Sequence, residues 1–166
     1  VTTGGRQALS STAGSPSAHG WSSTSRRIAY LWSPPPRVGA DHLVSATRTE
    51  VRVLDVATRA SRTAASLRSL GLSLSWRPRH EELIFDDGGQ LWSVGADGAQ
   101  LRRVSGRKGG VTEWNPAWSA DGEWLAYVLT QSSGDAVVVR RMADRREWLV
   151  RCGDYTCGGL SWERQR

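Results

Sequence analysis

Residues 115–127 read NPAWSADGEWLAY, and this stretch decides how the whole chain is interpreted. Trp118 stands just before a polar turn at Asp121-Gly122, and an apolar run begins at Trp124. Gly tolerates a positive φ and Asp can bond its own backbone, so this dipeptide is typical of a tight turn. The stretch therefore predicts two β-strands joined by a tight turn, with Trp118 at the end of the first strand.

Tryptophans recur along the chain at a nearly constant spacing. They are Trp21, Trp76, Trp118 and Trp162. The intervals between them are 55, 42 and 44 residues, and the first is longer because it contains an expanded segment at Ser33–Thr49. A period of about 40–45 residues is that of a four-stranded β-propeller blade. We therefore expect the four tryptophans, together with Asp121 and Gly122, to form a repeated core pattern.

Short β-rich runs follow each of the first three tryptophans. The apolar runs that come first are 27–31, 83–85 and 124–128, and those that come second are 51–56, 91–94 and 136–139. Such runs, rich in β-branched and aromatic residues and broken by Gly, Asp and Ser, are strand signals. No stretch has a convincing apolar period of 3.6 residues. The sequence is therefore predicted to be all-β.

The stretch at 115–127 resembles the Pro-x-Trp-Ser-Pro-Asp-Gly-x-x-Leu/Ile-Ala-Tyr/Phe signature of TolB-like, WD-like β-propeller repeats. It departs from that signature at Ala120, where the family usually has Pro. The first two copies are looser, with Thr24-Ser25 and Arg79-His80 in place of Asp-Gly. The resemblance implies a fold and not an activity, because this repeat recurs in transport, protease-associated and sensor proteins.

The repeat predicts an all-β, partial β-propeller of about three four-stranded antiparallel blades, with incomplete blades at both ends. The expected division is 1–16 for the end of a preceding blade, 17–69, 70–110 and 111–157 for three blades, and 158–166 for the start of another. Three blades leave exposed sheet edges, which natural proteins avoid. We therefore expect a piece of a longer propeller protein, whose remaining blades are partners of this segment. A self-assembling partial propeller is the alternative.

Charge and composition exclude several classes of protein. The formal net charge is +6, and Lys108 is the only lysine among 22 cationic residues. The arginines include pairs at 26–27, 102–103, 140–141 and 145–146, and no basic stripe in the sequence collects them, so we expect solvated faces and no nucleic-acid partner. A polyanion site is the alternative. No apolar run approaches the roughly 18 residues of a membrane span, so no insertion into a membrane is expected within this segment.

Motifs for catalysis, cofactors and metals are not found, so the segment is predicted to be non-enzymatic and to need no cofactor. The histidines, His19, His42 and His80, lie far apart without metal-ligand spacing. Cys152 and Cys157 bracket a short loop that is typical of a disulfide, which indicates an oxidising, extracytoplasmic compartment. Two free thiols in a cytosolic protein are the alternative.

Three segments are candidates for a partner-binding face, because loops on a rigid scaffold usually carry binding. In a propeller, the second-to-third-strand loops and the blade-to-blade connections share one face. The candidate residues are Arg37 and His42 in the expanded segment, Arg107, Lys108 and Trp114 near the next connection, and Tyr155 between the cysteines. The alternative is that the Pro34–Pro36 insertion is tolerated surface variation.

These features predict a non-catalytic scaffold that binds a protein or an envelope component, as the resemblance to TolB-like repeats implies. Two other functions stay open. One is the propeller portion of a prolyl-oligopeptidase-like serine hydrolase, in which such blades gate a catalytic domain. The other is the sensor domain of a membrane regulator. The sequence names no ligand, because the repeated residues serve the fold.

Overall fold

Strands form where β-rich runs alternate with turns, as the sequence indicates. The computed structural model describes residues 15–35, 37–38, 44–45, 48–105, 107, 109–153 and 156–162. This part of the chain contains strands and turns and no helix, which confirms the all-β prediction. It accordingly holds no helix long and apolar enough to cross a membrane.

Twelve strands form three four-stranded antiparallel sheets, here called the first, second and third blades. The first consists of β1 (Ser15–Trp21), β2 (Arg27–Ser33), β5 (Glu50–Asp55) and β6 (Ser61–Ser66). The second consists of β7 (Leu74–Trp76), β8 (Glu82–Asp87), β9 (Gln90–Gly95) and β10 (Arg102–Arg103). The third consists of β11 (Thr112–Trp118), β12 (Trp124–Gln131), β13 (Gly134–Arg141) and β14 (Glu147–Arg151). A hairpin of β3 (Arg37–Val38) and β4 (Val44–Ser45) is inserted between β2 and β5.

The first blade begins slightly earlier than expected. Residues 1–16 are predicted above to end a preceding blade, but Ser15 and Pro16 pair with Ser33 and Trp32 across β1 and β2. The pairing continues through a register shift between Ser17 and His19. Because these residues share the ladder of the first blade, the boundary lies before Ser15.

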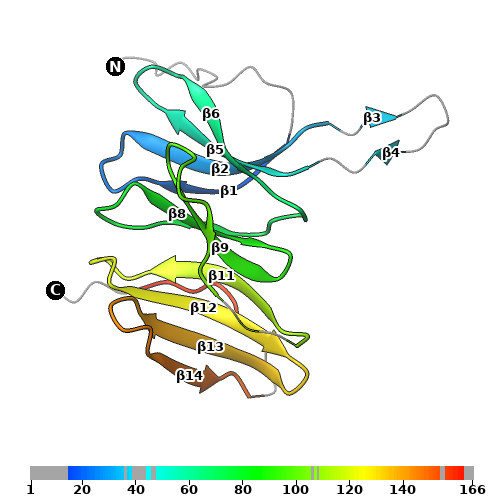
Figure 1. Cartoon of the computed structure of the whole chain (residues 1–166), viewed down its shortest axis with the longest axis vertical. Coiled ribbons are helices and arrows are strands. Elements are labelled where there is room, and N and C mark those ends of the chain that lie inside the picture. The colour runs from blue at the N-terminus through cyan, green and yellow to red at the C-terminus, as the bar shows by residue number, and fades with distance from the viewer. Residues whose placement is uncertain are drawn as a thin grey trace, which may run out of the picture.

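The blades follow one another along the long axis of the molecule, and an apolar core fills each of the two interfaces between them (Figure 1). The middle strand β8 shows how one sheet serves both cores. Leu83 and Phe85 belong to the core shared with the first blade, and Ile84 belongs to the core shared with the third. Successive side chains of a strand point to opposite faces, so this sheet is buried on both sides.

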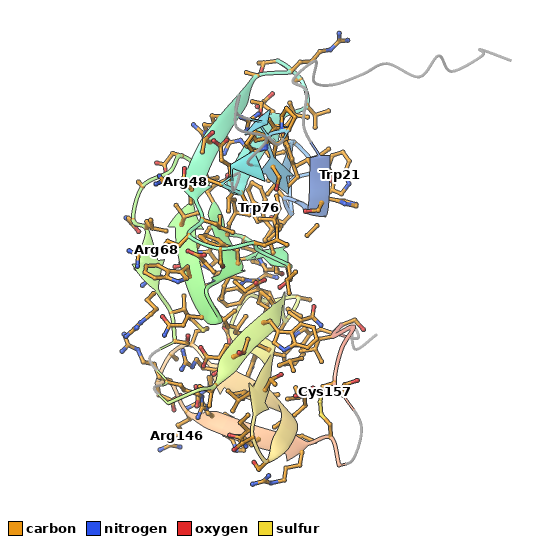
Figure 2. All side chains as sticks on the ribbon, turned by 90° about the vertical axis from the view of Figure 1, so that its right-hand side faces the viewer. Trp21, Arg48, Arg68, Trp76, Arg146 and Cys157 are labelled. Carbon is orange, nitrogen blue, oxygen red and sulfur yellow. A yellow bond between two sulfur atoms is a disulfide. The ribbon has the colours of Figure 1, made fainter. Side chains whose placement is uncertain are left out.

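The repeated tryptophans occupy equivalent places but differ in burial. Trp21, Trp76 and Trp118 each end the first strand of their blade and pair with the residue at the same offset in the next strand. Trp76 is covered by the first blade and Trp118 by the second. Trp21 was expected in the same core but is 54% exposed, because no described sheet lies on its open side. Figure 2 shows Trp21 at the margin of the molecule and Trp76 inside it.

The fourth tryptophan, Trp162, lies in the C-terminal segment beside the third blade. It is half-buried, and its Nε1 donates a hydrogen bond to the carbonyl of Ala117 at 3.0 Å. The described residues around it form no strand with a neighbour. The start of a further blade at 158–166 therefore stays a prediction.

The Asp121-Gly122 turn connects β11 to β12 and contacts the second blade. The Asp121 carboxylate accepts hydrogen bonds from the Ser119 hydroxyl (2.5 Å) and from the backbone N of Glu123 (2.9 Å). Gly122 has a φ of 75°, and a Cβ placed there would lie 2.8 Å from the carbonyl oxygen of Pro78. Only Gly satisfies both conditions, since left-handed φ and close backbone approach each disfavour a side chain.

Two buried carboxylates, which sequence reasoning missed, fix the connection between the first and second blades. Asp87 accepts hydrogen bonds from the backbone N atoms of Arg68 and Ser69 at 2.9–3.0 Å. Asp86 accepts from the backbone N and hydroxyl of Ser73 at 2.7 and 2.6 Å. Backbone N–H groups in a buried link need such partners, so these acids serve the fold.

The outer strand of the third blade leaves apolar side chains in solvent. Trp148, Leu149 and Val150 on β14 are exposed, and the Trp148 ring lies 5.4 Å from that of Trp124. The outer face of the first blade is instead polar: the hydroxyls of Tyr30 and Ser61 share a hydrogen bond, and Arg52 donates one to Glu50. The two ends of the stack are therefore chemically unlike.

Replacing Gly122 with Ala should destabilise the chain more than the same change at Gly88. Both glycines have a positive φ, which costs a side chain about 1–2 kcal/mol. A Cβ at Gly88 meets nothing within 4 Å, whereas one at Gly122 meets the Pro78 carbonyl, and such overpacking costs about 1–3 kcal/mol more. Urea unfolding of both variants measures the difference. Equal losses of unfolding free energy would show that the turn contact is not tight.

Candidate partner-binding face

The sheet register places the three candidate segments at one end of the blades. In the first blade, Glu50 pairs with both Trp32 and Ser66, so the expanded segment and the link to the second blade leave from the same end. The other two blades pair their strands in the same order. We call this end the loop face. The opposite end, which carries the first-to-second-strand and third-to-fourth-strand turns, is the turn face.

The β3–β4 hairpin is the part of the loop face that extends furthest from the sheets. It projects to the right in Figure 1, on the side where the β12–β13 hairpin also ends, and Figure 2 looks onto this end. Arg37 lies in β3 opposite Ser45. His42, Lys108 and Tyr155 lie outside the described residues, so their place on this face stays a prediction.

Arg107 belongs to an ion-pair network between the second and third blades. Its guanidinium contacts the carboxylate of Glu147 on β14 and, at 3.4 Å, that of Glu113 on β11. Glu147 also accepts hydrogen bonds from Arg140 Nε (2.7 Å) and the Tyr127 hydroxyl (3.0 Å). These contacts give Arg107 a structural role, which the sequence did not indicate because its partners are far away along the chain.

Glu113 is a buried acid in this network. It is 1% exposed, and within the described residues its Oε1 makes no hydrogen bond. Burial raises the pKa of Glu113, and the hydrogen bond from Ser105 and the charges of Arg107 and Arg140 offset only part of that effect. Burial likewise raises the pKa of Tyr127. The interface thus favours neutral forms of both groups.

Trp114 is anchored and not free to rearrange around a partner. Its Nε1 donates to the hydroxyl of Thr130 at 3.0 Å. Its ring lies under the C-terminal segment, where a Cβ added at Gly158 would be 4.0 Å from it. The Trp114 side chain is therefore already engaged in contacts within the fold.

A disulfide joins Cys152 and Cys157, with 6.0 Å between their Cα atoms. Both residues are tied to Asp135 at the start of β13. The backbone N of Cys152 donates to its carbonyl at 3.1 Å, and that of Cys157 donates to its carboxylate at 3.2 Å. The bond therefore holds the connection after the third blade against the loop face.

Metal-binding groups do not assemble in the part of the chain that is described. His19 lies in β1 of the first blade, and His80 lies in a turn of the second. Among the same residues, no three His, Cys, Asp or Glu side chains come close enough together to hold a metal ion.

No family model and no curated protein matches the sequence. Solved structures do resemble the fold. A putative TolB from Agrobacterium tumefaciens matches 85% of this chain and 50% of its own length, with 16% identity and a TM-score of 0.64. The chain has the fold of a partial β-propeller. At this low sequence identity the match shows a shared architecture alone, and the strand order of the three blades agrees with that architecture.

Two enzymes share the same architecture. An oligogalacturonate lyase in complex with manganese matches 86% of this chain and 44% of its own, with 12% identity and a TM-score of 0.67. A puromycin-hydrolyzing peptidase from Mycobacterium tuberculosis matches 92% of this chain and 24% of its own, with 20% identity and a TM-score of 0.64. The partial propeller thus spans at most half of each of these three proteins.

Glu82 on β8 is an acid in the opposite electrostatic setting to Glu113. It accepts hydrogen bonds from Arg77 Nη1 (3.0 Å) and Arg102 Nη2 (2.7 Å). Burial alone would raise the pKa of Glu82, but these hydrogen bonds outweigh it and the pKa is lowered.

Glu113→Gln and Glu82→Gln should change the pH dependence of stability in opposite directions. Because the pKa of Glu113 is raised in the folded state, its ionisation lowers the free energy of unfolding as pH rises above about 4.5. Glu113→Gln does not ionise, so its stability relative to the wild type should increase over the same pH range. Because the pKa of Glu82 is lowered in the folded state, its carboxylate stabilises the fold above about 4.5, and this stabilisation is lost as pH falls. The deficit in unfolding free energy of Glu82→Gln relative to the wild type should therefore be largest near neutral pH. Urea unfolding between pH 3 and pH 7 tests both. Parallel profiles would contradict the assignment.

Removing the disulfide should have a modest effect on stability. A loop closed by cysteines five positions apart gains on the order of 2 kcal/mol from restricting the unfolded chain. Thermal unfolding of Cys152→Ser/Cys157→Ser, compared with oxidised wild type, measures this loss. Wild type unfolded with a reductant present is the control and should match the variant. A loss several times larger would mean that the bond also supports packing of the third blade.

Proposed function

We propose that this partial propeller is a non-catalytic scaffold that binds a protein or an envelope component through the loop face. The observation that carries the proposal is the β3–β4 hairpin, which stands out from a rigid sheet at the end where the blade connections gather (Figure 1). A projecting hairpin adds contact area without disturbing the blades that hold it.

The framework beneath the loop face supports this role. The Arg107 network and the Cys152–Cys157 bond fix the two blade connections that flank the third blade. Fixed connections lower the entropy that is lost on association, which favours affinity. The proposal keeps Arg37, His42, Lys108 and Tyr155 as the contact residues for the partner.

An extracytoplasmic location accompanies the proposal. Its support is the disulfide, because such bonds persist in oxidising compartments. The likeness to TolB proteins agrees with it.

The rival function is the propeller portion of a hydrolase. It is favoured by the match to the puromycin-hydrolyzing peptidase, of which this chain covers about a quarter, so that a catalytic domain has room elsewhere in such a protein. A serine-directed fluorophosphonate probe applied to the full-length protein distinguishes the two. Covalent labelling would establish the rival and contradict the non-catalytic role.

Binding through the loop face predicts that Arg37→Ala/His42→Ala weakens partner capture by about tenfold, since contact side chains at hot spots each contribute more than about 1 kcal/mol. The measurement is quantitative recovery of bound proteins from an envelope extract, with the full-length protein as bait. The matched control is Arg26→Ala/His80→Ala, which removes the same residue types at exposed positions on the turn face. Equal capture by both double variants would refute the loop face as the binding surface.

A further inference from the structure

An arginine-lined groove lies between the second and third blades, on the turn face and away from the proposed partner site. Its volume is about 760 Å³, within the range of small-molecule pockets. Six arginines line it: Arg77, Arg102 and Arg103 from the second blade, and Arg140, Arg141 and Arg145 from the third. Both blades are whole sheets, so neither wall of the groove depends on residues beyond the described ones.

The repeat brings these arginines together from distant parts of the sequence. Arg102 begins the outer strand of one blade, and Arg140-Arg141 ends the third strand of the next. Because neighbouring blades face each other in parallel order, both positions reach the same interface at the turn face. The sequence led us to expect separate solvated faces for the arginine pairs, but the pairs at 102–103 and 140–141 line one groove.

The acids around the groove do not balance the arginines. Three carboxylates are each shared between two guanidinium groups. Glu82 is shared by Arg77 and Arg102, Asp144 by Arg141 and Arg146, and Glu147 by Arg107 and Arg140. Within the described residues Arg145 has no acidic partner, and Glu123 is the one further acid that lines the groove. Positive charge is thus left over along both walls.

Specific contacts hold two arginines in place at the base of the groove. The Arg77 guanidinium lies 4.8 Å above the Trp118 ring, and its Nε donates to the Gly122 carbonyl at 3.0 Å. Arg140 donates from Nη1 to the Val104 carbonyl at 2.8 Å. These two side chains are largely buried, whereas Arg102 and Arg141 at the rim are exposed. Buried guanidinium groups below and exposed ones above suit capture of an anion.

We propose that this groove binds a compact, multiply charged oxyanion group, a phosphate or a sulfate, carried on a small ligand. Guanidinium forks match the geometry of such groups and hold them with paired hydrogen bonds. More than one negative charge is required, because the surplus of arginines exceeds what a single carboxylate neutralises. Apolar Trp118 and Met142 at the base contact the body of the ligand.

The test is isothermal titration of the full chain with inorganic pyrophosphate at pH 7 and constant ionic strength. Arg102→Gln and Arg145→Gln should each weaken binding about tenfold, because each removes a charge-assisted contact. The matched control is Arg59→Gln, which changes the equivalent turn of the first blade at the same φ of 60° as Arg145. It should alter binding less than about twofold, because Arg59 does not line the groove and acts on the ligand only through screened long-range charge. A heparin-derived tetrasaccharide is the second probe, and the tighter binder of the two shows whether phosphate or sulfate is preferred.

Several results would overturn the proposal. Absence of binding by both probes is one, and binding that neither groove variant weakens is another. Equal weakening by Arg59→Gln would mean that only net charge attracts the anion. Unfolding curves of all variants show whether the sheets remain intact, and a folded Arg145→Gln that binds like wild type is decisive against the site. The partner-capture result on the loop face has no bearing on these outcomes.

Discussion

Burial of the second sheet on both faces is the constraint on which the rest of the structure depends. Leu83, Ile84 and Phe85 follow one another in β8 and are all enclosed, alternately by the first and the third blade. Each such side chain contributes about 1.5–3 kcal/mol when withdrawn from water, so the contacts between blades contribute substantially to the stability of the second sheet. This explains why the tryptophan repeat matters: it marks the place where one sheet meets the next.

Local features of the sequence were sufficient for the architecture and insufficient for the sites. The Trp118 and Gly122 pattern predicted the turn and the blade period because a tight turn and a strand end depend on residues that are adjacent in the chain. Exposure of Trp21 depends on whether a sheet lies beyond it, and the role of Arg107 depends on Glu113 and Glu147 in another blade. Neither relation has a local signature. A paired acid such as Asp86-Asp87 before a Gly-rich turn was a signal that could have been read as backbone capping.

The preference for arginine over lysine has a structural use in this chain. A guanidinium group presents five donors, so it can hold a carboxylate, a backbone carbonyl and an aromatic ring at once. Arg77 does all three, with Glu82, Gly122 and Trp118. A lysine carries its three donors on one nitrogen and has no planar group to stack on the ring, so it could not make this set of contacts. The arginine-rich composition therefore also supplies connections between the sheets.

The contact between neighbouring turns has a geometric consequence for a ring of blades. Gly122 of the third blade rests on Pro78 of the second, and the backbone N of Arg79 in the second donates to the Ser23 hydroxyl of the first at 3.3 Å. Both contacts lie at the same end of their blades and act as spacers there, so together they set the angular step from each sheet to the next. In a ring of such blades, contacts repeated at one end of every interface hold the sheets closer there, so small residues in these turns bear on the angle between neighbouring sheets.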